Sequence, residues 1–206
     1  MTEDIWLVCA EPVWLRNHLG VAQHSRKNLL LLSACFRLIW EWLPDACRNW
    51  VLVAERIADS AGNRDQLNNG AVHNWFWDEH YAGDGETRDL IIDSLWGLFG
   101  VYKGRPEQGG TDDEDFIQEL ARQAALVRDI FGNPFRPVTF DPAWRSATVV
   151  SLSQAIYDER VFDRMPILAD ALEDAGCNNA DVLNHCRQPG EHVRGCWVVD
   201  LVLGKE

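Results

Sequence analysis

The chain has 206 residues, of which 47% are apolar, so it can form one domain, alone or with a looser appendage. Its formal net charge of −13 argues against direct binding to nucleic-acid phosphates, because such binding needs a basic face. The same charge is compatible with a basic protein partner, with mimicry of a nucleic acid, or with simple solubility through like-charge repulsion.

The start of the chain does not look like a secretory signal. Glu3 and Asp4 stand where such a signal needs basic residues, and no long apolar stretch follows them. The longest apolar run, residues 29–35, is too short to cross a bilayer. We therefore expect a cytoplasmic protein with no membrane partner, whose six cysteines are thiols.

Apolar residues recur at helical spacing and predict an all-α protein, an irregular multi-helix bundle of about eight to ten helices. In the N-terminal half, Pro12 begins a short helix, and Pro44 separates a helix over 26–43 from another that ends near Gly62. Another helix is expected over 87–99, before a Gly- and Pro-containing linker at 104–110. The predicted divisions are an N-terminal helical segment, a middle segment with its linker, and a C-terminal helical module, at 1–62, 63–110 and 111–206.

The predicted C-terminal module consists of helices with recognisable caps. Its first helix follows a capping-box sequence at 111–114 and stops at Gly132, and its third stops at Gly176. Asp141-Pro142 caps the second helix, and Asn178 or Asn179 caps the fourth. In chain order, the helices are expected from 111 to 131, from 141 to about 156, from 166 to 175, from 179 to about 186, and from about 193 to 203.

Four motifs stand out in the last third of the chain: DIFGNPFRP (129–137), YDER (157–160), LADALEDAGC (168–177) and VRGCWVVDLVLGK (193–205). Through them the chain resembles a paralogous family of uncharacterised planctomycete proteins of the Gemmata type. The resemblance is specific over 123–206 and looser over 1–62, and the middle segment is similar to that family's variable insert. It implies the identity of the C-terminal module and the division of the chain, and it implies no reaction.

The sharpest candidate site is a group of imidazoles and thiols near the C-terminus. Cys and His are the usual ligands of a tetrahedral zinc ion. His192 and Cys196 are four residues apart and would share a face of the expected last helix. A straight helix would separate Cys177 from His185 by about 12 Å along its axis, so Cys177 is harder to include. A structural zinc, a catalytic metal, and no cofactor at all remain open for the candidate ligands His185, Cys186, His192 and Cys196, with Cys177 as a further member.

A second group of candidates consists of charged residues around two of the motifs. Guanidinium groups match carboxylates in a two-pronged geometry, so we expect a structural polar network that fixes the loop 133–137 against the helix ending at Tyr157. The alternative is a polar pocket in which Asp158 or Glu159 acts as acid or base. The members are Arg136, Asp158, Glu159, Arg160, Asp163 and Arg164.

A third group lies in the middle segment and combines histidines with tryptophans. Exposed aromatic side chains of this kind are typical of an interaction surface. Asp78 and Glu79, between the two histidines, could instead complete a metal site, and a half-buried amphipathic helix explains the pattern equally. The interaction candidates are His73, Trp75, Trp77 and His80.

No Gly-rich phosphate loop, Gly-x-Ser-x-Gly elbow or His-Glu-x-x-His motif occurs in the chain. The favoured function is therefore a non-enzymatic protein-interaction or adaptor module, with a protein partner that could be basic. One alternative is a small zinc-binding domain or metal-dependent enzyme that uses the C-terminal Cys/His group. Another is an acidic inhibitor that mimics a nucleic acid.

Overall fold

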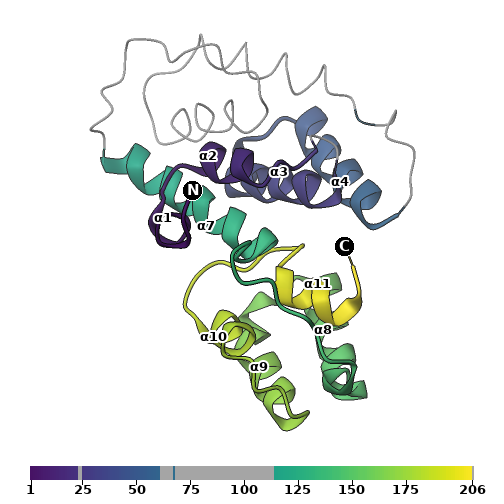
Figure 1. Ribbon diagram of the computed structural model, residues 1–206. Helices are drawn as coiled ribbons and strands as arrows, with labels where there is room; N and C mark the ends of the chain where they lie inside the picture. The colour runs from purple at the N-terminus through teal and green to yellow at the C-terminus, as the bar shows by residue number, and fades with distance from the viewer. Residues whose placement is uncertain (23–24, 61–66, 68–113, 206) are drawn as a thin grey trace. The chain divides into compact units, whose positions relative to one another are not determined.

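The computed structural model describes residues 1–22, 25–60, 67 and 114–205. Within these residues every regular element is a helix, which confirms the predicted all-α class (Figure 1). Of the helices described, none combines the length and the apolarity that crossing a bilayer requires. The contacts divide the chain into two compact units, Met1–Val127 and Arg128–Glu206.

The N-terminal unit begins with four helices whose starts follow from local sequence. Thr2 and Ser25 cap α1 and α3 through their side-chain oxygens, and Pro12 occupies the first position of α2. Pro44 precedes the fourth helix, where its fixed φ suits the N-cap position. The helices are α1 (Glu3–Val8), α2 (Pro12–His18), α3 (Arg26–Leu38) and α4 (Asp45–Asp59).

Helices α3 and α4 pack on each other and supply much of the core of this unit (Figure 1). Phe36 meets Trp50 edge-on, with ring centroids 5.6 Å apart. The guanidinium of Arg37 donates to both carboxylate oxygens of the buried Glu55, at 2.7 and 2.9 Å. Such a two-pronged charged contact fixes the register of the two helices as well as their proximity.

The C-terminal unit contains the end of α7 and four shorter α-helices. Ser146 caps α8 and Asn179 caps α10, each by accepting a backbone N–H three residues on. Gly132 and Gly176 follow α7 and α9 with φ of 70° and 89°, the left-handed conformation that ends a helix. The helices are α7 (Glu114–Phe131), α8 (Ala147–Glu159), α9 (Met165–Asp174), α10 (Ala180–Arg187) and α11 (Trp197–Leu203).

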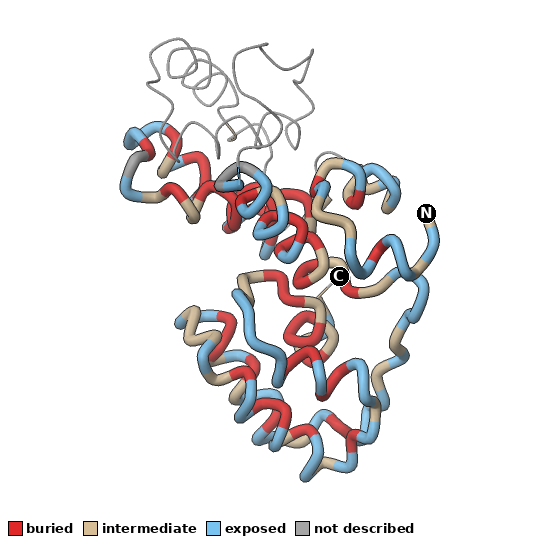
Figure 2. The backbone as a smooth tube through the Cα atoms, turned by 90° about the vertical axis from the view of Figure 1, so that its left-hand side faces the viewer, coloured by how far each residue is buried: buried red, intermediate tan, exposed pale blue. Residues whose placement is uncertain are grey.

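The core of this unit is one cluster that draws on α8, α9, α10 and α11. Buried residues, red in Figure 2, recur along each helix between exposed ones, as expected for amphipathic helices. Tyr157 is fully buried, and the charged ends of Arg194 and Lys205 lie 4.6 and 4.4 Å from its ring centre. Three cysteines, Cys177, Cys186 and Cys196, also belong to this cluster.

Two helix starts in the C-terminal unit differ from the sequence prediction. The last helix begins at Trp197 rather than near residue 193, because Gly195 adopts φ of 97° and interrupts any helix before it. Asp141 caps only a 3-10 turn over Pro142–Trp144, and α8 starts separately behind Ser146.

Two further differences lie in the N-terminal unit. The helix expected over 26–43 ends at Leu38, and a 3-10 turn over Trp40–Trp42 follows it. Helix α1 was not predicted, since six residues are too few to show a helical period. The expected helix over 87–99 and the linker at 104–110 lie outside the described residues.

Candidate metal centre

Asp129 lies in the last turn of α7 and is buried, with only 3% of its surface exposed. A buried carboxylate at the negative end of a helix is unfavourable in two ways, so it needs strong partners. It has three. Its Oδ1 lies 2.6 Å from His192 Nδ1 and 3.1 Å from His185 Nε2, and its Oδ2 accepts the Val193 N–H at 2.9 Å.

His185 is positioned by α10, on the side of that helix that faces the core. Its side chain is 8% exposed, and its ring lies 5.1 Å from the ring of Trp197. The side-chain amide of Gln188 lies 3.2 Å from Nδ1. The other ring nitrogen, Nε2, is the one that faces Asp129.

His192 and Cys196 come from the loop between α10 and α11. The loop turns at Gly190 and Gly195, with φ of 148° and 97°, and so the side chains of 192 and 196 do not share a helix face as the sequence predicted. Cys196 is fully buried at the N-cap of α11. Its sulfur lies 3.2 Å from His185 Nε2 and 4.0 Å from His192 Nδ1.

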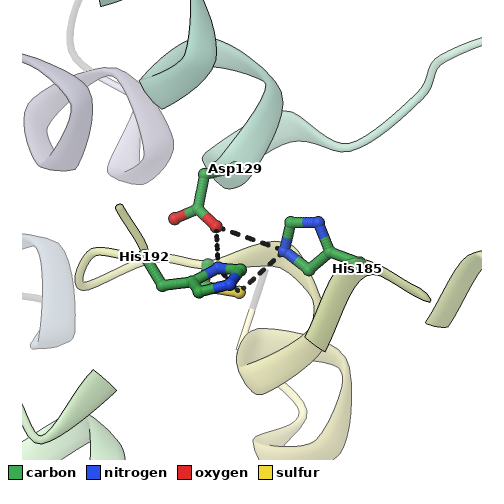
Figure 3. A group of neighbouring side chains, drawn as sticks. Asp129, His185 and His192 are labelled. Atoms are coloured by element: carbon green, nitrogen blue, oxygen red, sulfur yellow. Dashed lines mark hydrogen bonds and ion pairs between the residues drawn. The ribbon is translucent and has the colours of Figure 1, made fainter. Parts of the chain in front are cut away.

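Four potential ligand atoms thus converge from three separate segments of the C-terminal unit. Figure 3 shows Asp129 opposite the two imidazoles, with the sulfur beside them. One atom from each of Asp129, His185, His192 and Cys196 lies within 4.8 Å of all the others. Around a tetrahedral zinc, bonds of roughly 2.0–2.3 Å separate neighbouring ligand atoms by roughly 3.3–3.8 Å. The separations, from 2.6 Å up to 4.8 Å, lie on both sides of that range, so some of them would have to change by about 0.7–1 Å to complete the geometry.

The electrostatics of the group follow from burial and from its one carboxylate. Burial alone would raise the pKa of Asp129, but the hydrogen bonds from His185 and His192 and their electrostatic attraction together outweigh it and hold that pKa below its usual range. Burial raises the pKa of Cys196 well above that of an ordinary thiol, and the negative charge of Asp129 adds to the effect. Without a metal, Cys196 is therefore a protonated thiol at neutral pH, and a bound metal must displace its proton.

This arrangement is not a nucleophilic Cys–His–Asp triad. A triad uses the two ring nitrogens of its histidine for different partners, one for the nucleophile and one for the carboxylate. Here the same nitrogen, His185 Nε2, lies against both Cys196 Sγ and Asp129 Oδ1. A buried thiol with a raised pKa is also a poor nucleophile.

One ring atom in the group lacks a partner among the described residues. His192 Nε2 is buried and makes no hydrogen bond there. If His192 binds a metal through Nδ1, the proton must sit on Nε2. A buried donor without a partner costs about 1–3 kcal/mol, which bonds to the metal would have to offset.

The structure places the other sequence-predicted ligands in the hydrophobic core. Cys186 is fully buried, and burial raises its pKa to about 12. Cys177 is 3% exposed, and burial raises its pKa as well. The converging ligand atoms thus include three of the residues predicted from sequence, His185, His192 and Cys196, together with Asp129, which sequence reasoning missed.

The six residues of the predicted polar network belong to the same unit, where each is exposed or half-buried. Arg136 pairs with Asp181 at 3.6 Å, and Asp158 accepts a hydrogen bond from Gln154 at 2.7 Å. Arg160 has φ of 58° and ends α8 in the left-handed conformation. The side chains of the three acidic members, Asp158, Glu159 and Asp163, are exposed, and Arg164 is half-buried.

The predicted interaction cluster, His73, Trp75, Trp77 and His80, lies outside the described residues. Comparison of the chain with models of known protein families, with curated proteins and with solved structures gives no match. The candidate centre therefore rests on its own geometry.

Proposed function

We propose that the C-terminal unit binds one divalent transition-metal ion through Asp129, His185, His192 and Cys196, and that this ion has a structural role. The observation that carries the proposal is the convergence of four ligand atoms of suitable chemistry within 4.8 Å.

The donor set fits such an ion. Imidazole nitrogen, thiolate sulfur and carboxylate oxygen are the three ligand types found in protein zinc sites. Outer contacts hold two of the donors in place: the Gln188 amide meets His185 Nδ1, and the Val193 N–H meets Asp129 Oδ2. Contacts of this kind orient metal ligands. A histidine that binds a metal through Nε2 carries its proton on Nδ1, so Gln188 must turn its amide oxygen toward that atom when the ion is bound.

A structural role follows from where the ligands come from. Asp129 and His192 are 63 positions apart, so an ion between them closes a long loop of the chain. Closing a loop of 15 to 100 residues with a covalent bridge stabilises a fold by about 3–5 kcal/mol, and a metal cross-link acts in the same way. The side chains of the ligands are also too deeply buried for substrate to reach the ion, since the most exposed of them, His185, is 8% exposed.

Metal content tests the proposal. The full chain, purified without chelators, is expected to carry one transition-metal ion per molecule by elemental analysis and native mass spectrometry. Cys196→Ala should lose the ion. Cys186→Ala is the matched control, because it removes another fully buried thiol beside His185 that is not among the converging ligands.

Two outcomes would contradict the proposal. One is a folded, metal-free protein that takes up no zinc when zinc is added. The other is equal loss of metal in both cysteine variants. The adaptor function predicted from the sequence depends on the middle segment, which lies outside the described residues.

A further inference from the structure

We infer that the centre takes Zn²⁺ in a closed, four-coordinate sphere of one carboxylate oxygen, two imidazole nitrogens and one thiolate sulfur. The inference rests on the metal binding proposed above and adds the identity of the ion, its coordination number and the ligand atoms.

The oxygen side of the sphere is limited to one atom. Asp129 Oδ2 accepts the Val193 N–H at 2.9 Å, whereas Oδ1 lies 2.6 and 3.1 Å from the two imidazole nitrogens and is the oxygen that faces the group. Among the converging residues, Asp129 is the one carboxylate. Calcium takes 6–8 oxygen ligands, and magnesium requires near-octahedral geometry with several retained waters. A site with one protein oxygen and little access to solvent suits neither ion.

The nitrogen side supplies two atoms whose identity the contacts fix. Gln188 lies against His185 Nδ1 at 3.2 Å and leaves Nε2 for the ion. In His192 it is Nδ1 that faces the group, 2.6 Å from Asp129 Oδ1. The ring centroids of the two histidines lie 4.9 Å apart at an interplanar angle of 76°.

The sulfur completes a set of four ligands, and the burial of all four leaves no position open to solvent. Cys196 is fully buried, and the side chains of the other three ligands are between 4% and 8% exposed. Manganese, iron and nickel in six-coordinate sites would need two further ligands that this group does not provide. Zinc sites with four protein ligands and no bound water are the structural class. One thiolate among harder donors also favours Zn²⁺ over Cu⁺, which prefers sulfur.

Cobalt substitution tests this inference on the full chain. Metal-free protein is titrated with CoCl₂ and followed by absorption spectroscopy. We expect intense visible bands of four-coordinate cobalt and a near-ultraviolet thiolate charge-transfer band, both saturating at one equivalent. One equivalent of ZnCl₂ should abolish them, and a large excess of MgCl₂ or CaCl₂ should not. Cys196→Ser should lose the charge-transfer band, whereas Cys186→Ser should keep it.

The outcomes separate this inference from the metal binding on which it rests. Stoichiometric cobalt with only weak, six-coordinate bands would overturn the closed zinc sphere and leave metal binding intact. Displacement of cobalt by magnesium or calcium would do the same. No binding of cobalt or zinc by the folded chain would overturn both. A charge-transfer band that survives in Cys196→Ser and disappears in Cys186→Ser would show that the sulfur ligand is Cys186 and not Cys196.

Discussion

Asp129→Asn is the substitution that separates the buried carboxylate from everything else in the site. The side chain keeps its shape, and its amide oxygen can still accept the Val193 N–H. The negative charge that holds His185 and His192 is lost, and the amide N–H₂ now faces one of the ring nitrogens. A hydrogen bond to a charged group contributes about 1.5–3 kcal/mol, and two of them are altered, so the cost is about 3–6 kcal/mol. In a chain of this size, 1 kcal/mol shifts the melting temperature by roughly 2–4 °C, so we expect a fall of roughly 6–24 °C.

The assay is thermal unfolding followed by circular dichroism, with and without EDTA. For the unsubstituted chain, removing the metal should lower the melting temperature, since the ion binds only the folded state. For Asp129→Asn, EDTA should change little, because the site has already lost one ligand and its charge.

Asp170→Asn is the matched control for this experiment. It is the same chemical change on another helix of the unit, at an exposed position beside Arg187. It should leave both the melting temperature and the response to EDTA unchanged. If Asp129→Asn has the same melting temperature as the unsubstituted chain, and EDTA lowers both equally, the reasoning about the centre is wrong.

Three further predictions concern the surroundings of the centre and the cysteines. Gln188→Ala should weaken zinc binding about 10–100-fold in a competition titration without unfolding the protein, because it removes the contact that orients His185. An unchanged affinity would mean that this contact does not contribute to zinc binding. Gly132→Ala places a Cβ 3.2 Å from Trp197 Cγ, at a position where φ is 70°. Gly176→Ala, where the Cβ meets open space, carries only the left-handed strain of about 1–2 kcal/mol. Denaturant unfolding should therefore show a larger loss of unfolding free energy for Gly132→Ala. Iodoacetamide at pH 8 should label Cys9 first in the folded chain, because the other five cysteines are buried. Burial also raises the pKa of Cys47 to about 11. Early labelling of Cys47 would contradict its burial.

Much of the fold could be predicted because helix ends are encoded locally. Ser25, Asn179 and Gly132 mark ends of helices through their own side chains or their own φ, and each could be recognised in the sequence. The start of α11 could not be placed as well. Gly195 adopts φ of 97°, and the sequence does not show whether a glycine will take a helical or a left-handed conformation.

The candidate site could be predicted only in part, for a reason of distance along the chain. His185, His192 and Cys196 all lie between positions 185 and 196, so their residue types and spacing already suggest a common site. Asp129 lies 63 positions before His192, and only tertiary packing brings it there. Its one local signal is a carboxylate in the last turn of a helix, where the helix dipole disfavours it.

The choice between neighbouring candidates also needed the structure. His185 and Cys186 are adjacent on α10, and adjacent helical residues point in directions about 100° apart. We therefore expect only one of the two side chains to reach a given ion from a regular helix. The packing of α10 settles which one faces Asp129, and it is His185, while Cys186 joins the apolar core.

X-ray absorption at the zinc edge of the purified full chain tests the central claim most directly. The structure predicts one sulfur at about 2.3 Å and three nitrogen or oxygen neighbours at about 2.0–2.1 Å, with the outer-shell signature of two imidazoles. A first shell without sulfur, a shell of six light atoms, or a chain that holds no zinc would contradict it.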